Sequence, residues 1–234
     1  MARSASLDLL KWLAIVSMIG DHLRYLWPQQ EWLFIPGRLA FPLFCLALAA
    51  NVLRATTIQW RYLWWFLGFS LLSEVPYRWL DNGSPTLNVM PTLGLGLLLA
   101  WGVHLRTRAA TWLALVAAFV ATLGSAWLMY GLPGVLLPAA LLIALKERRF
   151  AWLAGLLAVA GNFTNGWLFQ HPLAPVSLMV AGTAFMAVSL GLALLRHEWP
   201  GPVPPVGRWA WAFYPLHLAA ISVFAHMVPA GTGF

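Results

Sequence analysis

Residues 7–22 read LDLLKWLAIVSMIGDH, an apolar run that follows a short basic leader and continues through polar Asp21 and His22. Apolar runs of about 14 to 23 residues recur from there to the end of the chain, which is the length range of membrane-spanning helices. The first run has no small-residue cleavage site, so we expect a retained signal anchor rather than a removed signal peptide. The pattern predicts an all-α protein built inside a lipid bilayer.

The composition excludes a soluble fold. Of the 234 residues, 61% are hydrophobic and 9% are charged, whereas a soluble domain carries about 25% charged residues. The connectors between the runs are short, so we expect one transmembrane domain over residues 1–234. A net charge of +7 is typical of cytoplasmic loops beside anionic lipid, so we expect the bilayer as a partner and no nucleic acid. Cys45 is the single cysteine, which excludes an intramolecular disulfide, and we predict no metal site.

Apolar runs and helix breakers together predict a polytopic helical bundle of about nine spans, with about seven to ten allowed. The predicted spans cover residues 7–26, 37–55, 61–79, 87–105, 110–129, 132–145, 150–168, 173–195 and 209–227. The sixth is short and contains Pro133 and Pro138. We therefore expect it to be a half-span or a broken helix that is buried in protein rather than exposed to lipid.

The basic residues predict the orientation of the bundle. With the N-terminus in the cytoplasm, ten of the fourteen basic residues fall on cytoplasmic ends of spans, as the positive-inside rule requires. These ten are Arg3, Arg54, Arg61, Arg106, Arg108, Lys146, Arg148, Arg149, Arg196 and Arg208. Arg24, Arg38 and Arg78 then fall at outer ends, and Lys11 lies within the first span. We expect a cytoplasmic N-terminus and a C-terminal end outside.

Ionisable residues within the spans are the main functional signal, because each costs at least ~2.5 kcal/mol at mid-bilayer unless it is paired or hydrated. Those at predicted outer ends are Asp21, His22, Arg24, Arg38, Glu74 and Arg78, with Tyr77, Asn88 and Thr92 beside them. We expect them to form a wet, charged pocket that opens on the outer side. Alternatively, Glu74 and Arg78 are four residues apart in the favourable order and satisfy each other.

Lys11 and His22 are eleven residues apart in the first predicted helix. This spacing is a rotation of about 1100°, so the two side chains share a face, with an axial separation of about 16 Å. A bound molecule could bridge them. The alternatives are that Lys11 snorkels to the surface or pairs with Asp8, and that Asp21 and His22 form a hydrated helix end.

Six segments carry a resemblance to a known family. They are LDLLKWLAIVSMIGDH (7–22), GRLAFPLFCLALA (37–49), SEVPYR (73–78), LNVMPTLGLGLL (87–98), YGLPGVLL (130–137) and FYPLHLAA (213–220). In this order, and over nearly the whole chain, they resemble the TraX family of bacterial inner-membrane proteins. The resemblance implies acetylation, because the type member transfers an acetyl group from acetyl-CoA to the N-terminal alanine of a conjugative pilin. The family is similar to the acyltransferase-three superfamily of membrane acetyltransferases.

The resemblance also implies roles for individual residues. The superfamily has a basic residue, ten residues and a histidine in its first helix, which places Lys11 on the donor side and His22 at the catalytic position; arginine is more frequent at the first of these. An amine acceptor has a pKa near 8 and must lose a proton, so a base is required. His22 would act as that base or as a covalent acetyl relay, and the sequence leaves both routes open.

Other residues would support this chemistry. Asp21 or Glu74 would hold the tautomer of His22 or bind the acceptor ammonium. Arg38, or Tyr214 together with His217, would stabilise the thioester oxyanion. Donor phosphates would meet cytoplasmic cations, which the positive-inside rule also explains without a ligand. The predicted cofactor-binding residues are Lys11, Arg54, Arg61, Arg106 and Arg108.

Other interpretations stay open at this point. The acceptor could be a hydroxyl group of a surface glycan or a lipid instead of a pilin amine. A transporter also needs a charged cavity, although we find no internal repeat that pairs two halves of the chain. A non-catalytic membrane chaperone is a third class. The sequence does not predict an oligomeric state, because lipid-facing and partner-facing surfaces have the same composition.

Overall fold

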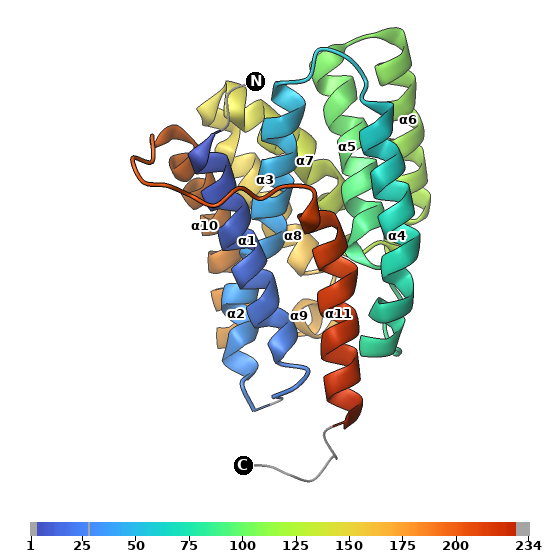
Figure 1. Ribbon diagram of the computed structural model, residues 1–234, viewed down its shortest axis with the longest axis vertical. Coiled ribbons are helices and arrows are strands. Elements are labelled where there is room, and N and C mark those ends of the chain that lie inside the picture. Colours follow the sequence, from blue (N-terminus) through green and yellow to red (C-terminus); the bar gives the residue numbers. More distant parts are fainter. Residues whose placement is uncertain (1–3, 28, 228–234) are drawn as a thin grey trace.

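The computed structural model describes residues 4–27 and 29–227, and within these ranges the regular secondary structure is helical (Figure 1). The α-helices are α1 Ala5–Leu23, α2 Phe34–Gly37, α3 Ala40–Leu53, α4 Trp60–Leu80, α5 Val89–Leu105, α6 Arg108–Leu123, α7 Gly131–Lys146, α8 Ala151–Asn162, α9 Gly166–Gln170, α10 Pro175–Arg196 and α11 Trp209–Met227. Short 3-10 turns are η1 Glu31–Leu33, η2 Ser125–Trp127 and η3 Arg148–Phe150. The long helices run up and down in alternation.

Every predicted span corresponds to one helix or to two consecutive helices. The range 37–55 corresponds to α2 and α3, and the range 150–168 corresponds to α8 and part of α9. The expectation of a break in 132–145 was wrong, because α7 is continuous through Pro138. Pro133 causes no break because it lies in the first turn, where a backbone N–H needs no partner inside the helix. The expected burial of this helix in protein is confirmed.

Three of the described helical segments are long and apolar enough to cross a membrane: Phe34–Leu53, which combines α2 with α3, and the helices α10 and α11. The helices α5, α6 and α7 are apolar but shorter. The helix α1 carries Asp8, Lys11 and Asp21, which lower its hydropathy. These segments identify a helical membrane protein, while nine spans and a cytoplasmic N-terminus stay predictions.

The centre of the bundle is formed by α3 and α7, whose Leu43, Leu46, Leu137 and Leu141 are fully buried. On one side α1 packs against α3, and α10 packs against α8. On the other side α4, α5 and α6 form a neighbouring layer. The last helix, α11, packs along α4 and contacts α1 much less. This arrangement leaves a space between α1, α3, α4 and α11 that positions the site.

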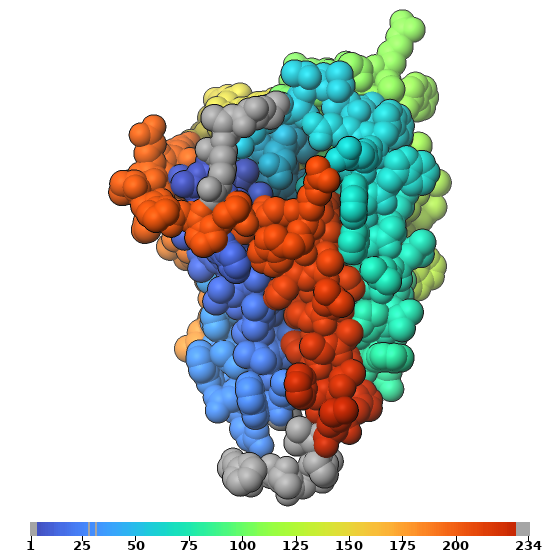
Figure 2. Space-filling model, in the orientation of Figure 1, coloured from blue at the N-terminus to red at the C-terminus, as the bar shows by residue number. Residues whose placement is uncertain are grey.

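The connector 197–208 joins α10 to α11 and crosses the N-terminal half of α1 (Figure 2). The indole of Trp12 donates a hydrogen bond to the carbonyl of Pro204 at 3.0 Å. The backbone N–H of Val206 donates to the carboxylate of Asp8 at 3.2 Å, and the hydroxyl of Ser6 donates to the carbonyl of His197. The proline-rich connector is therefore fixed to α1 at several points.

Two glycines of α5 test how tightly the bundle is packed. A Cβ atom at Gly96 would lie 2.7 Å from Cγ of Pro138 in α7, whereas one at Gly94 would lie 3.8 Å from Phe66. Both changes to alanine improve helix propensity by up to about 1 kcal/mol. Overpacking costs about 1 to 3 kcal/mol, so we expect Gly96→Ala to lower the free energy of unfolding and Gly94→Ala to leave it equal or higher. Unfolding in detergent measures both, and equal stability of the two variants would contradict the packing.

Candidate functional site

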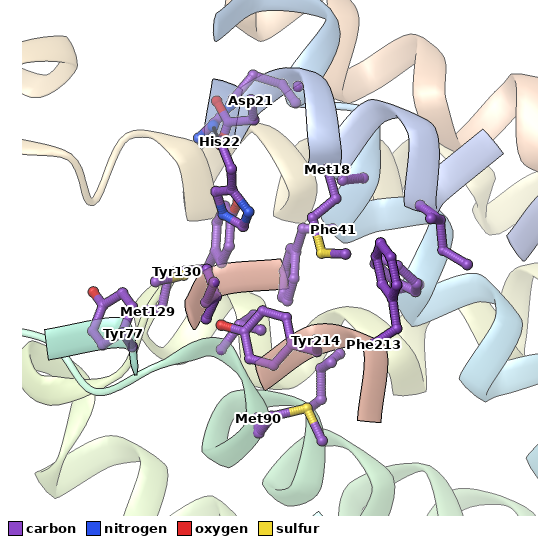
Figure 3. A pocket seen from close by; sticks show the side chains of 18 of the residues that line it. Met18, Asp21, His22, Phe41, Tyr77, Met90, Met129, Tyr130, Phe213 and Tyr214 are labelled. Carbon is purple, nitrogen blue, oxygen red and sulfur yellow. Dashed lines mark hydrogen bonds and ion pairs between the residues drawn. The ribbon is translucent and has the colours of Figure 1, made fainter. Parts of the chain in front are cut away.

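A cavity of about 710 Å³ occupies the space between α1, α3, α4, α5 and α11 (Figure 3). Its lining extends along α1 from Lys11 to Arg24, a helical distance of about 20 Å. Asn51 and Arg208 line it near Lys11, at the end of the bundle where α1 begins. Tyr25, Asp81 and Ser84 line it near Arg24, at the opposite end. The cavity therefore reaches both ends of the bundle.

The walls between these two ends are mainly apolar. They are formed by Met18, Phe41, Phe44, Phe66, Met90, Leu93, Trp211 and Phe213. Lys11 and His22 both line the cavity, which confirms the prediction that they share a face. Lys11 also lies 3.8 Å from the carboxylate of Asp8, so the pair weighed from the sequence is present as well.

An ion pair joins the end of α1 to the junction of α2 and α3. Nη2 of Arg38 donates a hydrogen bond of 2.5 Å to Oδ2 of Asp21, and Nε of Arg24 lies 3.3 Å from Oδ1. Arg38 also donates from Nε to the carbonyl of Phe34 at 3.2 Å. Gly37 permits the approach, because a Cβ there would lie 2.6 Å from Cβ of Asp21. The Asp21 carboxylate is therefore paired with arginine.

His22 pairs with a second histidine of the last helix. Its Nδ1 lies 2.7 Å from Nε2 of His217, and Nδ1 of His217 lies 3.0 Å from the carbonyl of Phe213. A carbonyl oxygen only accepts, so a neutral His217 carries its proton on Nδ1 and accepts at Nε2. His22 must then donate from Nδ1, which leaves the lone pair on its Nε2. His22 lines the cavity, so this lone pair is the part of the ring available to a ligand.

Glu74 has a structural role. Its carboxylate accepts from Nε of Arg78 at 2.7 Å, and from the backbone N–H and the side-chain amide of Asn88 at 3.0 and 2.7 Å. These bonds tie the end of α4 to the start of α5, and Glu74 does not line the cavity. The structure thus disagrees with a catalytic Glu74 and agrees with the alternative that it satisfies Arg78. Neither Asp21 nor Glu74 holds the His22 ring, which His217 holds instead.

The candidate oxyanion donors are placed differently from one another. Arg38 lines the cavity but directs Nη2 and Nε at Asp21 and Phe34. His217 accepts from His22 through Nε2, so in the neutral pair this nitrogen has no proton to donate. Tyr214 is buried, lines the cavity and has its phenol oxygen against the backbone N–H of Val89. The expectation that Tyr214 and His217 act together is not supported by this geometry.

Four of the five predicted donor-binding residues do not line the cavity, although Arg54 lies close enough to Lys11 to act on it electrostatically. Arg54, Arg61, Arg106 and Arg108 are exposed and do not line the cavity. Lys11 does, and Arg208 stands with it at the same end. Arg208 carried a weak signal in the sequence, since it directly precedes the last predicted span. The positive-inside pattern did not distinguish Arg208 from the four exposed arginines. It predicts which helix ends carry positive charge, but it does not predict which of these charges line a cavity.

Sequence reasoning also missed Tyr25, Asp81 and Tyr130, which all line the cavity. The hydroxyl of Tyr25 donates to Oδ2 of Asp81 at 3.2 Å. In the described part of the chain, Asp81 lies in no ion pair, whereas Asp21 and Glu74 are both paired with arginine. A signal for Asp81 was present in its position just beyond the end of the third predicted span, 61–79. Tyr130 begins the segment YGLPGVLL that carries the family resemblance, but no charge or spacing in the sequence marked it as part of a site.

The fold and the cavity together define a helical membrane protein in which ionisable side chains such as Asp21, His22 and Arg38 line one cavity. The chain belongs to the TraX family, because the family described as TraX protein matches residues 6–225. It is 28% identical over 237 residues to Protein TraX of Escherichia coli and 29% identical over 232 residues to Protein TraX of Escherichia coli strain K12. Each match covers 93% of this chain and 86% of the relative. No solved structure matches.

The histidine pair makes a prediction about the position of a proton. In ¹⁵N spectra of histidine-labelled protein at neutral pH, we expect His22 to be protonated at Nδ1 and unprotonated at Nε2. The change His217→Leu removes the acceptor, so we expect His22 to gain the Nε2–H tautomer. A His22→Asn variant assigns the signals, and exposed His171 is the internal control. A wild-type His22 protonated at Nε2 would contradict the arrangement.

Proposed function

We propose that this protein is a membrane-bound acetyltransferase that moves an acetyl group from acetyl-CoA to an amine acceptor. The observation that carries the proposal is the contact of 2.7 Å between Nδ1 of His22 and Nε2 of His217, which leaves Nε2 of His22 unprotonated in a cavity that reaches both ends of the bundle. Membership of the TraX family supports it. In this proposal the protein lies in a bacterial inner membrane with the Lys11 end of the cavity toward the cytoplasm.

The direct route uses His22 as a general base. The acceptor ammonium first loses one proton to solvent; the neutral amine nitrogen then attacks the thioester carbonyl carbon while Nε2 of His22 takes a second proton from it. As the C–N bond forms and the C–S bond breaks, the electron pair leaves on sulfur, and the imidazolium returns the proton to the thiolate. His217 keeps Nδ1 of His22 hydrogen-bonded, so Nε2 stays available for this exchange. The products are an acetylated amine and coenzyme A.

The relay route uses the same nitrogen as a nucleophile. Nε2 of His22 attacks the thioester, coenzyme A leaves as the thiolate, and an acetyl-imidazolium forms that keeps its proton on Nδ1. The amine then attacks this acetyl group, the bond between carbon and Nε2 breaks, and the proton of the amine goes to the thiolate or to solvent. This route lets donor and acceptor approach from opposite ends of the cavity. Both routes require the tautomer that His217 imposes.

The donor end of the cavity is the one lined by Lys11, Asn51 and Arg208. Cations there would pair with the phosphates of coenzyme A. From Lys11 to His22 the cavity follows α1 over about 16 Å between largely apolar walls. The pantetheine arm of coenzyme A suits this passage, because it is long and narrow. We therefore assign donor binding to Lys11 and Arg208 in place of Arg54, Arg61, Arg106 and Arg108.

The acceptor end contains Asp81, a carboxylate that lines the cavity and has no cationic partner in the part of the chain that the structure describes. Tyr25 holds it in place by a hydrogen bond. A carboxylate that lacks a cation favours a substrate that brings one, which an amine does and a glycan or lipid hydroxyl does not. The amine of a pilin N-terminus, which the TraX resemblance implies, has this chemistry.

Replacement of His22 tests the reaction itself. We expect His22→Ala to lower the rate of acetyl transfer by about 10² to 10⁴-fold, since it removes the base or nucleophile from both routes. The matched control is His171→Ala, whose histidine is exposed and lies outside the cavity. The measurement is acetyl transfer from labelled acetyl-CoA to a peptide with a free α-amine, with unfolding in detergent as the check on folding. A folded His22→Ala variant with full activity would exclude the mechanism.

The identity of the acceptor needs a measurement in cells. Intact masses of surface pilins and glycans, compared between cells with and without the gene, should differ by one acetyl group on the true acceptor. We expect the difference on a pilin amine. Acetylation that is unchanged on every candidate would overturn the enzymatic proposal, and a change on a glycan alone would replace the amine by a hydroxyl.

Replacement of Asp81 tests the choice between amine and hydroxyl. We expect Asp81→Asn to raise KM for a cationic peptide acceptor by about 10-fold or more, as expected for loss of a charge-assisted hydrogen bond. The KM for acetyl-CoA should stay within about twofold, because Asp81 lies at the other end of the cavity. The control is Glu147→Gln, an exposed carboxylate that pairs with Arg149. An unchanged acceptor KM would remove Asp81 from the acceptor site.

A further inference from the structure

Tyr130 has an uncommon backbone conformation. Its φ is +66°, and Gly131 follows with a φ of +54°, so two consecutive residues lie in the left-handed region before α7 begins. An aromatic residue disfavours this region, and such strain persists only where the surrounding structure imposes it. The backbone therefore directs the Tyr130 side chain to one place, on the wall of the cavity.

The ring of Tyr130 is fixed by stacking. It lies parallel to the ring of Phe41 in α3, with centroids 3.9 Å apart and an interplanar angle of 6°. Figure 3 shows Tyr130, Phe41 and His22 on the wall of the same cavity. The charged groups nearest in its electrostatic surroundings are Arg38 and Asp21. Tyr130 is thus a phenol held by stacking on the wall of the cavity that His22 also lines.

The hydroxyl group of Tyr130 makes no hydrogen bond with the described residues. The other donors of this region are engaged: Arg38 with Asp21 and Phe34, and His22 with His217. Tyr130 is only partly buried and its hydroxyl is not an enclosed atom, so it faces the open cavity as a donor that a ligand can use.

We propose that Tyr130 is a catalytic residue that donates its O–H to the oxyanion of the acetyl group under attack beside His22. This inference rests on the proposed function and adds to it the donor that completes the site. As the new bond to the carbonyl carbon forms, the C=O π pair moves onto oxygen, and the phenol hydrogen bond stabilises that charge. When the C–S bond breaks, the pair returns to the carbonyl and Tyr130 keeps its proton throughout.

The test is Tyr130→Phe, which removes the hydroxyl and keeps the ring that stacks on Phe41. We expect kcat for acetyl transfer to fall by about 10² to 10³-fold, as for loss of one oxyanion donor, with KM for acetyl-CoA and for the peptide within about twofold. The unfolding temperature should not change, whereas a purely structural role would lower it and leave kcat intact. The comparator is Tyr214→Phe, which removes the phenol that the sequence predicted as an oxyanion donor and that also lines this cavity.

The outcomes separate this inference from the proposed function. Active wild-type protein with an equally active Tyr130→Phe variant would overturn the role of Tyr130 and leave His22 in place. A larger loss of kcat in Tyr214→Phe than in Tyr130→Phe would move the role to Tyr214. A wild-type protein that transfers no acetyl group to amine or hydroxyl acceptors would overturn the proposed function, and the role of Tyr130 with it.

Discussion

The ion pair between Asp21 and Arg38 holds the last turn of α1 against the junction of α2 and α3. Both side chains are largely removed from solvent, with exposures of 15% and 11%, so loss of either partner would leave an uncompensated charge in the bundle. Gly37 brings the two backbones close enough for the pair to form. Because His22 directly follows Asp21, this contact also sets the direction in which the imidazole meets His217 and the cavity.

The helices could be predicted from the sequence because each long apolar run needs an intra-helical partner for every backbone amide. The positions at which these helices are interrupted could not be predicted from the sequence. Residues 150–168 read as one apolar run, yet the chain ends α8 at Asn162, and the Asn165 side chain caps α9 by accepting from the N–H groups of Trp167 and Leu168. In α7 the opposite occurs, since Pro138 is accommodated within a continuous helix. Both results depend on tertiary packing, which overrides local signals.

The part of the site that lies on one helix was predictable, and the part that joins helices was not. Helix geometry alone places Lys11 and His22 on a common face. The partner of His22 is 195 residues away in sequence, and its identity depends on how α11 closes the bundle beside α1. The same holds for the carboxylates: Asp21, Glu74 and Asp81 all lie near ends of predicted spans, and the three-dimensional arrangement of the arginines decides that Asp81 lacks a cation among the described residues.

The cavity is asymmetric about His22, which bears on how two substrates meet. The imidazole lies about 16 Å along α1 from Lys11 but one helical turn from Tyr25, whose hydroxyl binds Asp81. Under the proposed function, the donor must extend through a long apolar passage to reach His22. The acceptor needs to insert its reactive end from the other side by only about the length of one helical turn. This geometry suits a donor with a slender arm and an acceptor too bulky to enter. The walls formed by Met18, Phe41 and their neighbours also limit access of water to the acetyl group, which favours transfer over hydrolysis.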